Sequence, residues 1–514
     1  MRFKNSTALL SVSFAALTST SALADITADD LWNSYQTIAE TIGGELTATT
    51  TRDGNSVTFT DAKLNFTIET PEETFSIALL YPTLSYTNNT DGTVSMDMGG
   101  DHVYTLMATG PNPETDHLSV EVLANYDNAA LIASGTPDDI VFAYAMDGFT
   151  FELQNITSAE DLGFDASKVA VTGSANDVHG STRLQMGDLI TISDQSKISS
   201  LGFETQAFDT MAAKTLHSGT YNTMTNNYTV ALPTGGMAIT NLAAALKQGL
   251  ALSATSSTVS STSTTSVDLD GETVVSEKTT FGTSSGSVSA NADAIQMSGR
   301  GSDVSIENAA DHELPFDLSA KVATVDMDIR MPISASDAPQ DFTVAFNLGG
   351  LTVGEELWSL FDPAAVLPRD PATIDVNLTG QTTVFQDFMN FAKMMELSND
   401  DVPLELNALT VKNFLISAAG ASLSGTGDFA FNNDDLTSFD GMPAPSGSAE
   451  LQIAGANGLI DKLIQMGLIA ESDAMGARMM MGMLAVPGDG DDTLKSKLEI
   501  TEDGQILANG QRIK

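Results

Sequence analysis

Apolar and polar residues alternate along most of the chain, which is the pattern of half-buried β-strands. Large apolar residues occupy every second position at 75–81, and the alternation with polar residues is strict at 323–329. Asp-Gly and Gly-Gly pairs, which favour turns, separate many of these runs. The pattern predicts a mainly β (α+β) fold: large, curved, mostly antiparallel sheets with a few packed helices and a C-terminal helical hairpin.

One predicted strand changes its apolar side part-way along. Val57 and Phe59 occupy odd positions, whereas Leu64 and Phe66 occupy even positions. Because side chains of a strand alternate with a period of two, the change around Asp61 predicts a bulge or a tight turn there.

Helical spacing of apolar residues occurs in a few places. Thr27 precedes a run over 28–42 that begins with two acidic residues, which predicts an N-terminal helix. The segment after Pro233 echoes this opening helix and its following strand. We therefore expect two helix-plus-sheet halves, 25–233 and 234–514, the second with helical insertions near 384–397 and 457–484.

These two insertions form a candidate surface for an apolar ligand. A sheet with one apolar face needs a second layer, and methionine-rich helices adapt to varied apolar shapes. We expect the insertions to cover an apolar concavity of the sheet. The candidate ligand-contacting residues are Phe385, Phe388, Phe391, Met395, Leu459, Leu463, Met479 and Met483.

The first 24 residues have the three-part layout of a secretory signal peptide. Arg2 and Lys4 precede a short apolar run, and Ala22-Leu23-Ala24 is a small-x-small cleavage site. The apolar run is too short to span a bilayer. We expect cleavage after Ala24, a periplasmic location and no transmembrane helix in the mature chain.

Charge and composition restrict the possible functions. The 514 residues include 22 Lys and Arg against 67 Asp and Glu, a formal net charge of −45. Such a charge repels phosphate backbones, so nucleic-acid binding is excluded as a main function. The chain has no cysteine, which excludes disulfides, thiol catalysis and Cys-ligated metals.

Three local patterns invite a chemical interpretation, and for each a structural interpretation fits better. The segment from Gly282 to Gly286 matches the G-x-S-x-G nucleophile elbow, but its Ser/Thr-rich surroundings favour a hairpin turn. The acidic run 488–494 resembles one calcium-binding β-roll unit, a site that needs several stacked copies. The methionines at 479–483 suit Cu(I), but in an apolar helix methionine more often packs. We assign no catalytic, cofactor-binding or metal-ligating residue and expect no enzymatic activity.

Several segments resemble a known family. The segment from Leu357 to Thr373, the run 488–494 and the ending 502–510 are similar to exported proteins of Rhodobacter-like alphaproteobacteria, catalogued as domain of unknown function 2125. The hairpin over 409–427 and the Asp-Gly-Gln ending are more weakly similar to AsmA-type and YdgA-type envelope proteins. That second resemblance implies a β-rich protein with an apolar, lipid-handling surface. Neither family supplies a functional residue.

Together these features favour an exported, periplasmic envelope protein that binds lipid or another apolar ligand. A non-catalytic structural or interaction protein of the envelope is the alternative, and it predicts no cavity. An outer-membrane β-barrel ranks last, because 2 Trp, 8 Tyr and a terminal Lys514 do not fit its aromatic girdles. The identity of the ligand and the oligomeric state stay open.

Overall fold

The computed structural model describes residues 25–69, 73–112, 116–158, 166–208, 213–238, 241–309, 318–398 and 401–513. The expected signal peptide lies outside these ranges. Strand accounts for 64% of the structure and helix for 13%, which confirms the predicted mainly β fold. None of the helices within these ranges is long and apolar enough to cross a membrane.

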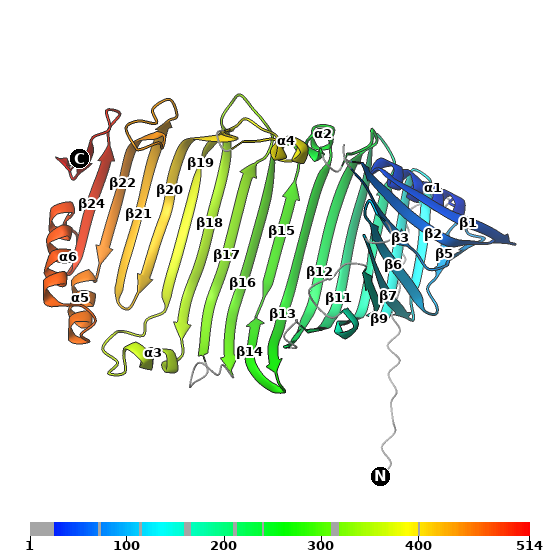
Figure 1. Ribbon diagram of the computed structural model, residues 1–514, viewed down its shortest axis with the longest axis horizontal. Helices are drawn as coiled ribbons and strands as arrows, with labels where there is room; N and C mark the ends of the chain where they lie inside the picture. Colours follow the sequence, from blue (N-terminus) through cyan, green and yellow to red (C-terminus); the bar gives the residue numbers. More distant parts are fainter. Residues whose placement is uncertain are drawn as a thin grey trace, which may run out of the picture.

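The described strands belong to one antiparallel sheet of 26 strands (Figure 1). The N-terminal strands are β1 (Gly44–Asp53), β2 (Ser56–Glu69), β3 (Thr74–Leu80), β4 (Leu84–Asn88), β5 (Val94–Asp97), β6 (His102–Thr109), β7 (His117–Asp127), β8 (Ala130–Thr136) and β9 (Asp139–Ser158). The middle strands are β10 (Ala170–Gln185), β11 (Leu189–Phe208), β12 (Lys214–Pro233), β13 (Ala251–Leu269), β14 (Glu272–Phe281), β15 (Ser284–Ala290), β16 (Ala294–Ala309), β17 (Leu318–Pro332) and β18 (Gln340–Val353). The C-terminal strands are β19 (Ala372–Val384), β20 (Leu404–Ala418), β21 (Ala421–Asn432), β22 (Ala444–Ala454), β23 (Val486–Pro487), β24 (Thr493–Ile500), β25 (Ile506–Ala508) and β26 (Gln511–Arg512).

From β9 onwards the long strands pair mostly in chain order, so distant parts of the chain share one continuous surface. Strand β12 pairs with β13 along most of its length, from Lys214 opposite Asp268 to Ala231 opposite Ala251. The two expected halves, which meet near residue 234, therefore lie in the same sheet without a break in hydrogen bonding.

The N-terminal strands carry the main core of the protein. Strands β2 and β9 are linked by two routes of pairing, one through β4, β5 and β8 and the other through β3, β6 and β7. The helix α1 (Ala28–Thr41) packs on this region, with Leu31 and Trp32 buried against Phe59 and Ile140. Thr27 caps the helix, because its hydroxyl accepts a hydrogen bond from the Asp30 N–H. The predicted N-terminal helix is confirmed.

One face of the sheet is apolar across nearly its whole width. Residues directly opposite each other in paired strands lie on the same face. Successive register partners on this face, from β12 to β24, are Tyr228, Ala254, Val288, Met297, Ile329, Val344, Leu378, Val411, Gly427, Ala449 and Leu498. We call this the apolar face and the opposite one the polar face.

Residues with positive φ interrupt several strands and keep the apolar face continuous. Asp61 has φ 54° in β2, at a register shift against β1, which confirms the predicted bulge. Asp177, Thr223 and Asp303 have φ values of 48°, 51° and 50° in β10, β12 and β16. At Asp303 the apolar positions change from odd to even numbers, so one side of β16 stays apolar. Such irregularities also bend strands, which favours a curved sheet.

The predicted hairpin turn at 282–286 is wrong. Strand β13 pairs with β14 over its second half and with β15 over its first half. Gly282 and Thr283 therefore form a kink between two strands that follow one another along β13. Ser284 is the first residue of β15, and the next element is β16.

The remaining helices lie around the margins of the long sheet (Figure 1). α2 (Leu242–Lys247) and α4 (Phe391–Met395) meet at one edge, where the Ala243 N–H donates to the Met389 carbonyl. α3 (Glu355–Phe361) lies at the opposite edge, and α5 (Ala456–Gln465) and α6 (Glu471–Leu484) lie at the C-terminal end. The helix expected near 384–397 is shorter in the structure, because β19 continues to Val384 and α4 has five residues.

Candidate functional site

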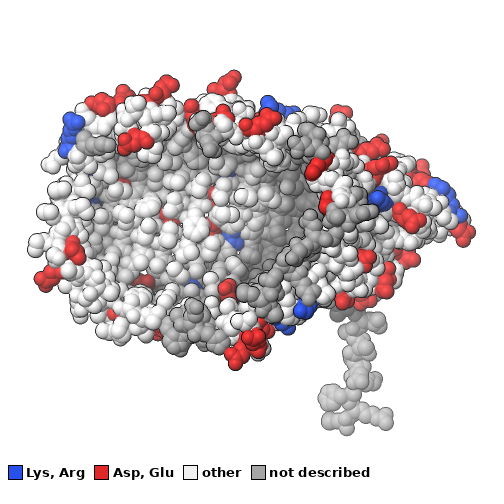
Figure 2. Space-filling model, in the orientation of Figure 1, with Lys and Arg blue, Asp and Glu red and all other residues white. Residues whose placement is uncertain are grey.

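The apolar face is hollowed along the long sheet. Figure 2 shows the side of the sheet on which α1 lies, with acidic and basic residues around the rim and few in the hollow. The core under α1 includes Leu232 and the half-buried Val230, which belong to the same face of β12 as Tyr228. The hollow is therefore the apolar face beyond α1. We call this part of it, from β12 to β24, the apolar trough.

Side chains in the trough are in contact with solvent. Met297 in β16 is 40% exposed, Phe346 in β18 is 39% exposed and Ile416 in β20 is 43% exposed. The described helices pack at the margins and at the α1 end, so they leave the middle of this face without a second layer. An apolar sheet face is normally covered, and monomeric proteins rarely expose apolar patches above a few hundred Å². The exposed face is the feature of this fold that most needs a functional explanation.

A smaller apolar pocket lies beneath α1, at the closed end of the sheet. Its volume is about 340 Å³, and Trp32, Ile38, Leu64 and Tyr104 are among the residues that line it. Burial raises the pKa of Tyr86, also in its wall, to about 12. The tyrosines therefore stay neutral at ordinary pH, and the pocket offers apolar surface with a few hydroxyl groups.

Asp194 places a carboxylate on the apolar face, at the boundary between the core that α1 covers and the open trough. Asp194 in β11 is only 6% exposed and lies opposite Tyr228, which is 39% exposed. Its Oδ2 accepts hydrogen bonds from the Tyr144 hydroxyl at 2.9 Å and the Thr182 hydroxyl at 2.8 Å. Burial, together with this hydrogen bond, raises the pKa of Tyr144, so its hydroxyl remains a donor.

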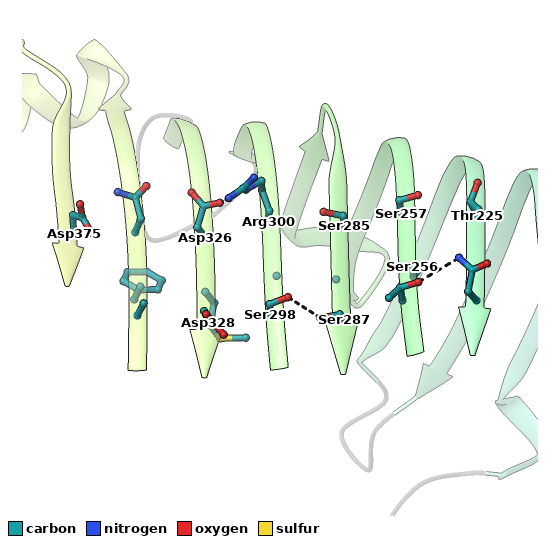
Figure 3. Close-up of a pocket in the computed structure, with 18 residues that line it drawn as sticks. Thr225, Ser256, Ser257, Ser285, Ser287, Ser298, Arg300, Asp326, Asp328 and Asp375 are labelled. Atoms are coloured by element: carbon teal, nitrogen blue, oxygen red, sulfur yellow. Dashed lines mark hydrogen bonds and ion pairs between the residues drawn. The ribbon is translucent and has the colours of Figure 1, made fainter. Parts of the chain in front are cut away.

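The polar face contains a shallow hollow of about 550 Å³ (Figure 3). Hydroxyl groups cover one part of it, with a Ser287–Ser298 hydrogen bond of 2.8 Å, and Asp328 and Asp375 contribute carboxylates. Arg300 donates to Asp326 at 2.5 Å. Within the described ranges, no group of three or more His, Cys, Asp or Glu is arranged to hold a metal ion. Most of the groups that line the hollow are polar and suit water and hydrogen-bonding solutes, although Met327 and Phe346 of the apolar face also contribute to its lining.

The eight candidate residues from the sequence do not come together in the structure. Phe385, Phe388, Phe391 and Met395 lie at the edge near α2 and α4, where Phe388 is half-buried and Met395 is 88% exposed. Leu459 and Leu463 are half-buried on α5, whereas Met479 and Met483 are exposed on α6. The two groups lie at different margins of the sheet and do not form a joint cover. Their contact with a ligand stays a prediction.

The trough residues were not among the candidates, although the sequence contains their signal. The alternation over 323–329 correctly predicts a strand with one apolar face. Met327 and Ile329 are not candidate residues, because helices were expected to cover that face of the sheet. No local sequence pattern marks Asp194, because its hydrogen-bond partners Tyr144 and Thr182 lie on two other strands, β9 and β10.

The acidic run 488–494 has a structural role. The Asp492 carboxylate accepts hydrogen bonds from the N–H groups of Asn457 and Gly458, in the first turn of α5. Asp489 forms an ion pair with Lys495. These contacts hold the helical hairpin against β24.

Neither a protein-family model nor a curated protein matches this sequence. We therefore infer the function from the geometry of the two faces.

Proposed function

We propose that this protein binds lipid, or another ligand with long apolar chains, in the apolar trough. The observation that carries the proposal is the continuous row of apolar register partners from Tyr228 in β12 to Leu498 in β24. Burial of apolar area contributes about 25 cal/mol per Å², so a chain lying along this row would gain affinity with every strand it crosses.

The arrangement of charge supports the same function. Acidic and basic residues lie mainly around the rim of the hollow, and only small patches of them are visible inside it (Figure 2). On the polar face, Arg300, Asp326 and Asp328 are among the residues that line the shallow hollow. An apolar chain in the hollow would therefore displace water without leaving charged groups desolvated. A polar head group would reach solvent at the open side.

The signal-peptide layout and the resemblance to exported envelope families support a periplasmic location. An exported protein with an exposed apolar face needs a ligand or partner on that face to remain soluble. The proposed lipid meets this need. We propose a non-enzymatic, lipid-binding protein of the cell envelope.

The direct test is the composition of the purified exported protein. Mass spectrometry of an organic extract should find lipid in a fixed ratio to protein, and the delipidated protein should bind an apolar fluorescent probe. A protein that carries no lipid and binds no probe would contradict the proposal. A structural or interaction role in the envelope, with a protein covering the apolar face, would then take its place.

A further inference from the structure

The apolar face has a polar interruption on β11, directly beside the trough, and residues of three strands form it. Asp194 projects from the same face as Tyr228 and its apolar partners Ala254 and Val288. A carboxylate on an apolar surface is costly unless it is paired, so its surroundings are informative.

The neighbouring strands are adapted to hold this carboxylate. Tyr144 lies opposite Gly180, and a Cβ atom at Gly180 would come within 2.5 Å of the Tyr144 hydroxyl oxygen. The glycine therefore leaves room for the phenol ring to lie across β10 and to donate to Asp194 on β11. Thr182 on β10 donates to the same oxygen.

Both donors reach Oδ2 and leave Oδ1 available. Among the described residues, Oδ1 forms no hydrogen bond, and no Lys, Arg or His pairs with the carboxylate. Although Asp194 is only 6% exposed, Oδ1 is not among the fully buried atoms without a partner, so a small part of it is accessible. The protein thus fixes one oxygen with neutral hydroxyls and presents the other without a cation.

We infer that Asp194 binds the primary ammonium head group of an amphiphile whose chain lies in the apolar trough. An ammonium group supplies the missing positive charge and N–H donors to Oδ1, and charge-assisted hydrogen bonds are the strongest kind. The apolar row that begins at Tyr228 would receive the chain next to the head group. This inference rests on the proposed function. It adds that the head group of the ligand is a primary ammonium and that Asp194 holds this end of the ligand.

The test is a competition experiment on the purified, delipidated full-length protein. The experiment measures how strongly each of three compounds displaces an apolar fluorescent probe. The compounds are dodecylamine, dodecyltrimethylammonium and dodecanol, each used below its aggregation concentration. The three share one chain, but the second has charge without N–H donors and the third has a donor without charge. We expect wild-type protein to bind dodecylamine most tightly.

Asp194→Asn should weaken dodecylamine binding about tenfold or more, since a charge-assisted hydrogen bond is lost. Dodecanol binding should change by less than about threefold, because it does not depend on charge. Asp326→Asn, on the polar face, is the matched control and should leave all three affinities unchanged. Tyr144→Phe removes a donor but keeps the carboxylate, so it should retain the preference for dodecylamine.

Two results would overturn the inference while leaving the proposed function in place. One is an Asp194→Asn protein that loses affinity equally for all three compounds. The other is a wild-type protein that binds the probe but shows no preference for dodecylamine. A wild-type protein that binds no probe at all would contradict the proposed function and this inference together.

Discussion

Trp32 of α1 stacks on Phe59 of β2, with the ring centroids 4.3 Å apart and the ring planes inclined by 13°. Both side chains belong to the buried core at the N-terminal end of the sheet. This contact fixes α1 on the apolar face. It also closes one end of a surface that is otherwise open.

The stacked pair predicts a large loss of stability on truncation. Trp32→Ala should lower the free energy of unfolding by about 3–5 kcal/mol, since it removes a buried aromatic side chain. Denaturant unfolding followed by circular dichroism measures this loss. Leu360→Ala, at a residue 58% exposed on α3, is the control and should change stability by less than about 0.5 kcal/mol. Equal effects of the two variants would contradict the assigned core.

Asp61 predicts a conformational rather than a packing effect. Its φ of 54° is unfavourable for residues with a Cβ atom, and most unfavourable for β-branched ones. Asp61→Gly should therefore preserve or slightly raise stability, whereas Asp61→Val should cost about 1–2 kcal/mol. Thermal unfolding of both variants compares them directly. A valine variant as stable as the glycine variant would show that the bulge does not require this conformation.

The fold was predictable from the sequence where a signal is local. The parity change from Phe59 to Leu64 indicated the bulge at Asp61, and the capping position of Thr27 indicated α1. The alignment of the interruptions at Asp177, Thr223 and Asp303 across the sheet was not predictable, because it depends on the registers of neighbouring strands.

The binding surface was harder to predict than the fold. A strand with one apolar side, such as the one with Met327 and Ile329, looks the same in sequence whether a helix or a ligand covers it. The helix expected over 384–397 also shortened, because Val384 completes a ladder with Leu404 in β20. The strand pairing with β20 therefore determines the structure at Val384, although the spacing of apolar residues there is typical of a helix.

The segment that contains Trp358, Asp362 and Arg369 is a structural cluster, and it predicts a pH dependence. Asp362 is buried beside Arg369, whose guanidinium lies 4.1 Å from the centre of the Trp358 ring. Burial acts to raise the pKa of Asp362, but hydrogen bonds from the Val366 and Leu367 N–H groups and from Arg369 outweigh it and lower the pKa. The stabilisation is therefore complete above about pH 4, the usual range for an unfolded Asp, and is lost as pH falls through the lower folded value.

Asp362→Asn isolates this contribution. The variant should melt at a lower temperature than the wild type at pH 7, and the difference should shrink as the pH falls below about 4. Melting curves of both proteins between pH 7 and pH 2.5 provide the comparison. A difference that stays constant over this range would mean that the charge of Asp362 does not contribute.

The net charge of −45 predicts a salt dependence. Repulsion among the acidic side chains destabilises the compact state, and salt screens it. The melting temperature should rise between low salt and about 0.5 M NaCl, where the Debye length is only a few ångströms. A constant or falling melting temperature over that range would contradict this expectation.

The central claim is that the apolar face, and not the polar one, binds the ligand. Phe346 and Ala345 are adjacent in β18, so their side chains project from opposite faces of the sheet. Phe346, opposite Met327, belongs to the apolar face, and Ala345, opposite Asp328, belongs to the polar face. The most direct measurement is apolar-probe binding and lipid content of Phe346→Asp and Ala345→Asp, with folding checked by circular dichroism. We predict that both variants fold, that Phe346→Asp loses most probe binding and co-purifying lipid, and that Ala345→Asp keeps both. Equal binding by the two variants, or a loss confined to Ala345→Asp, would contradict the account.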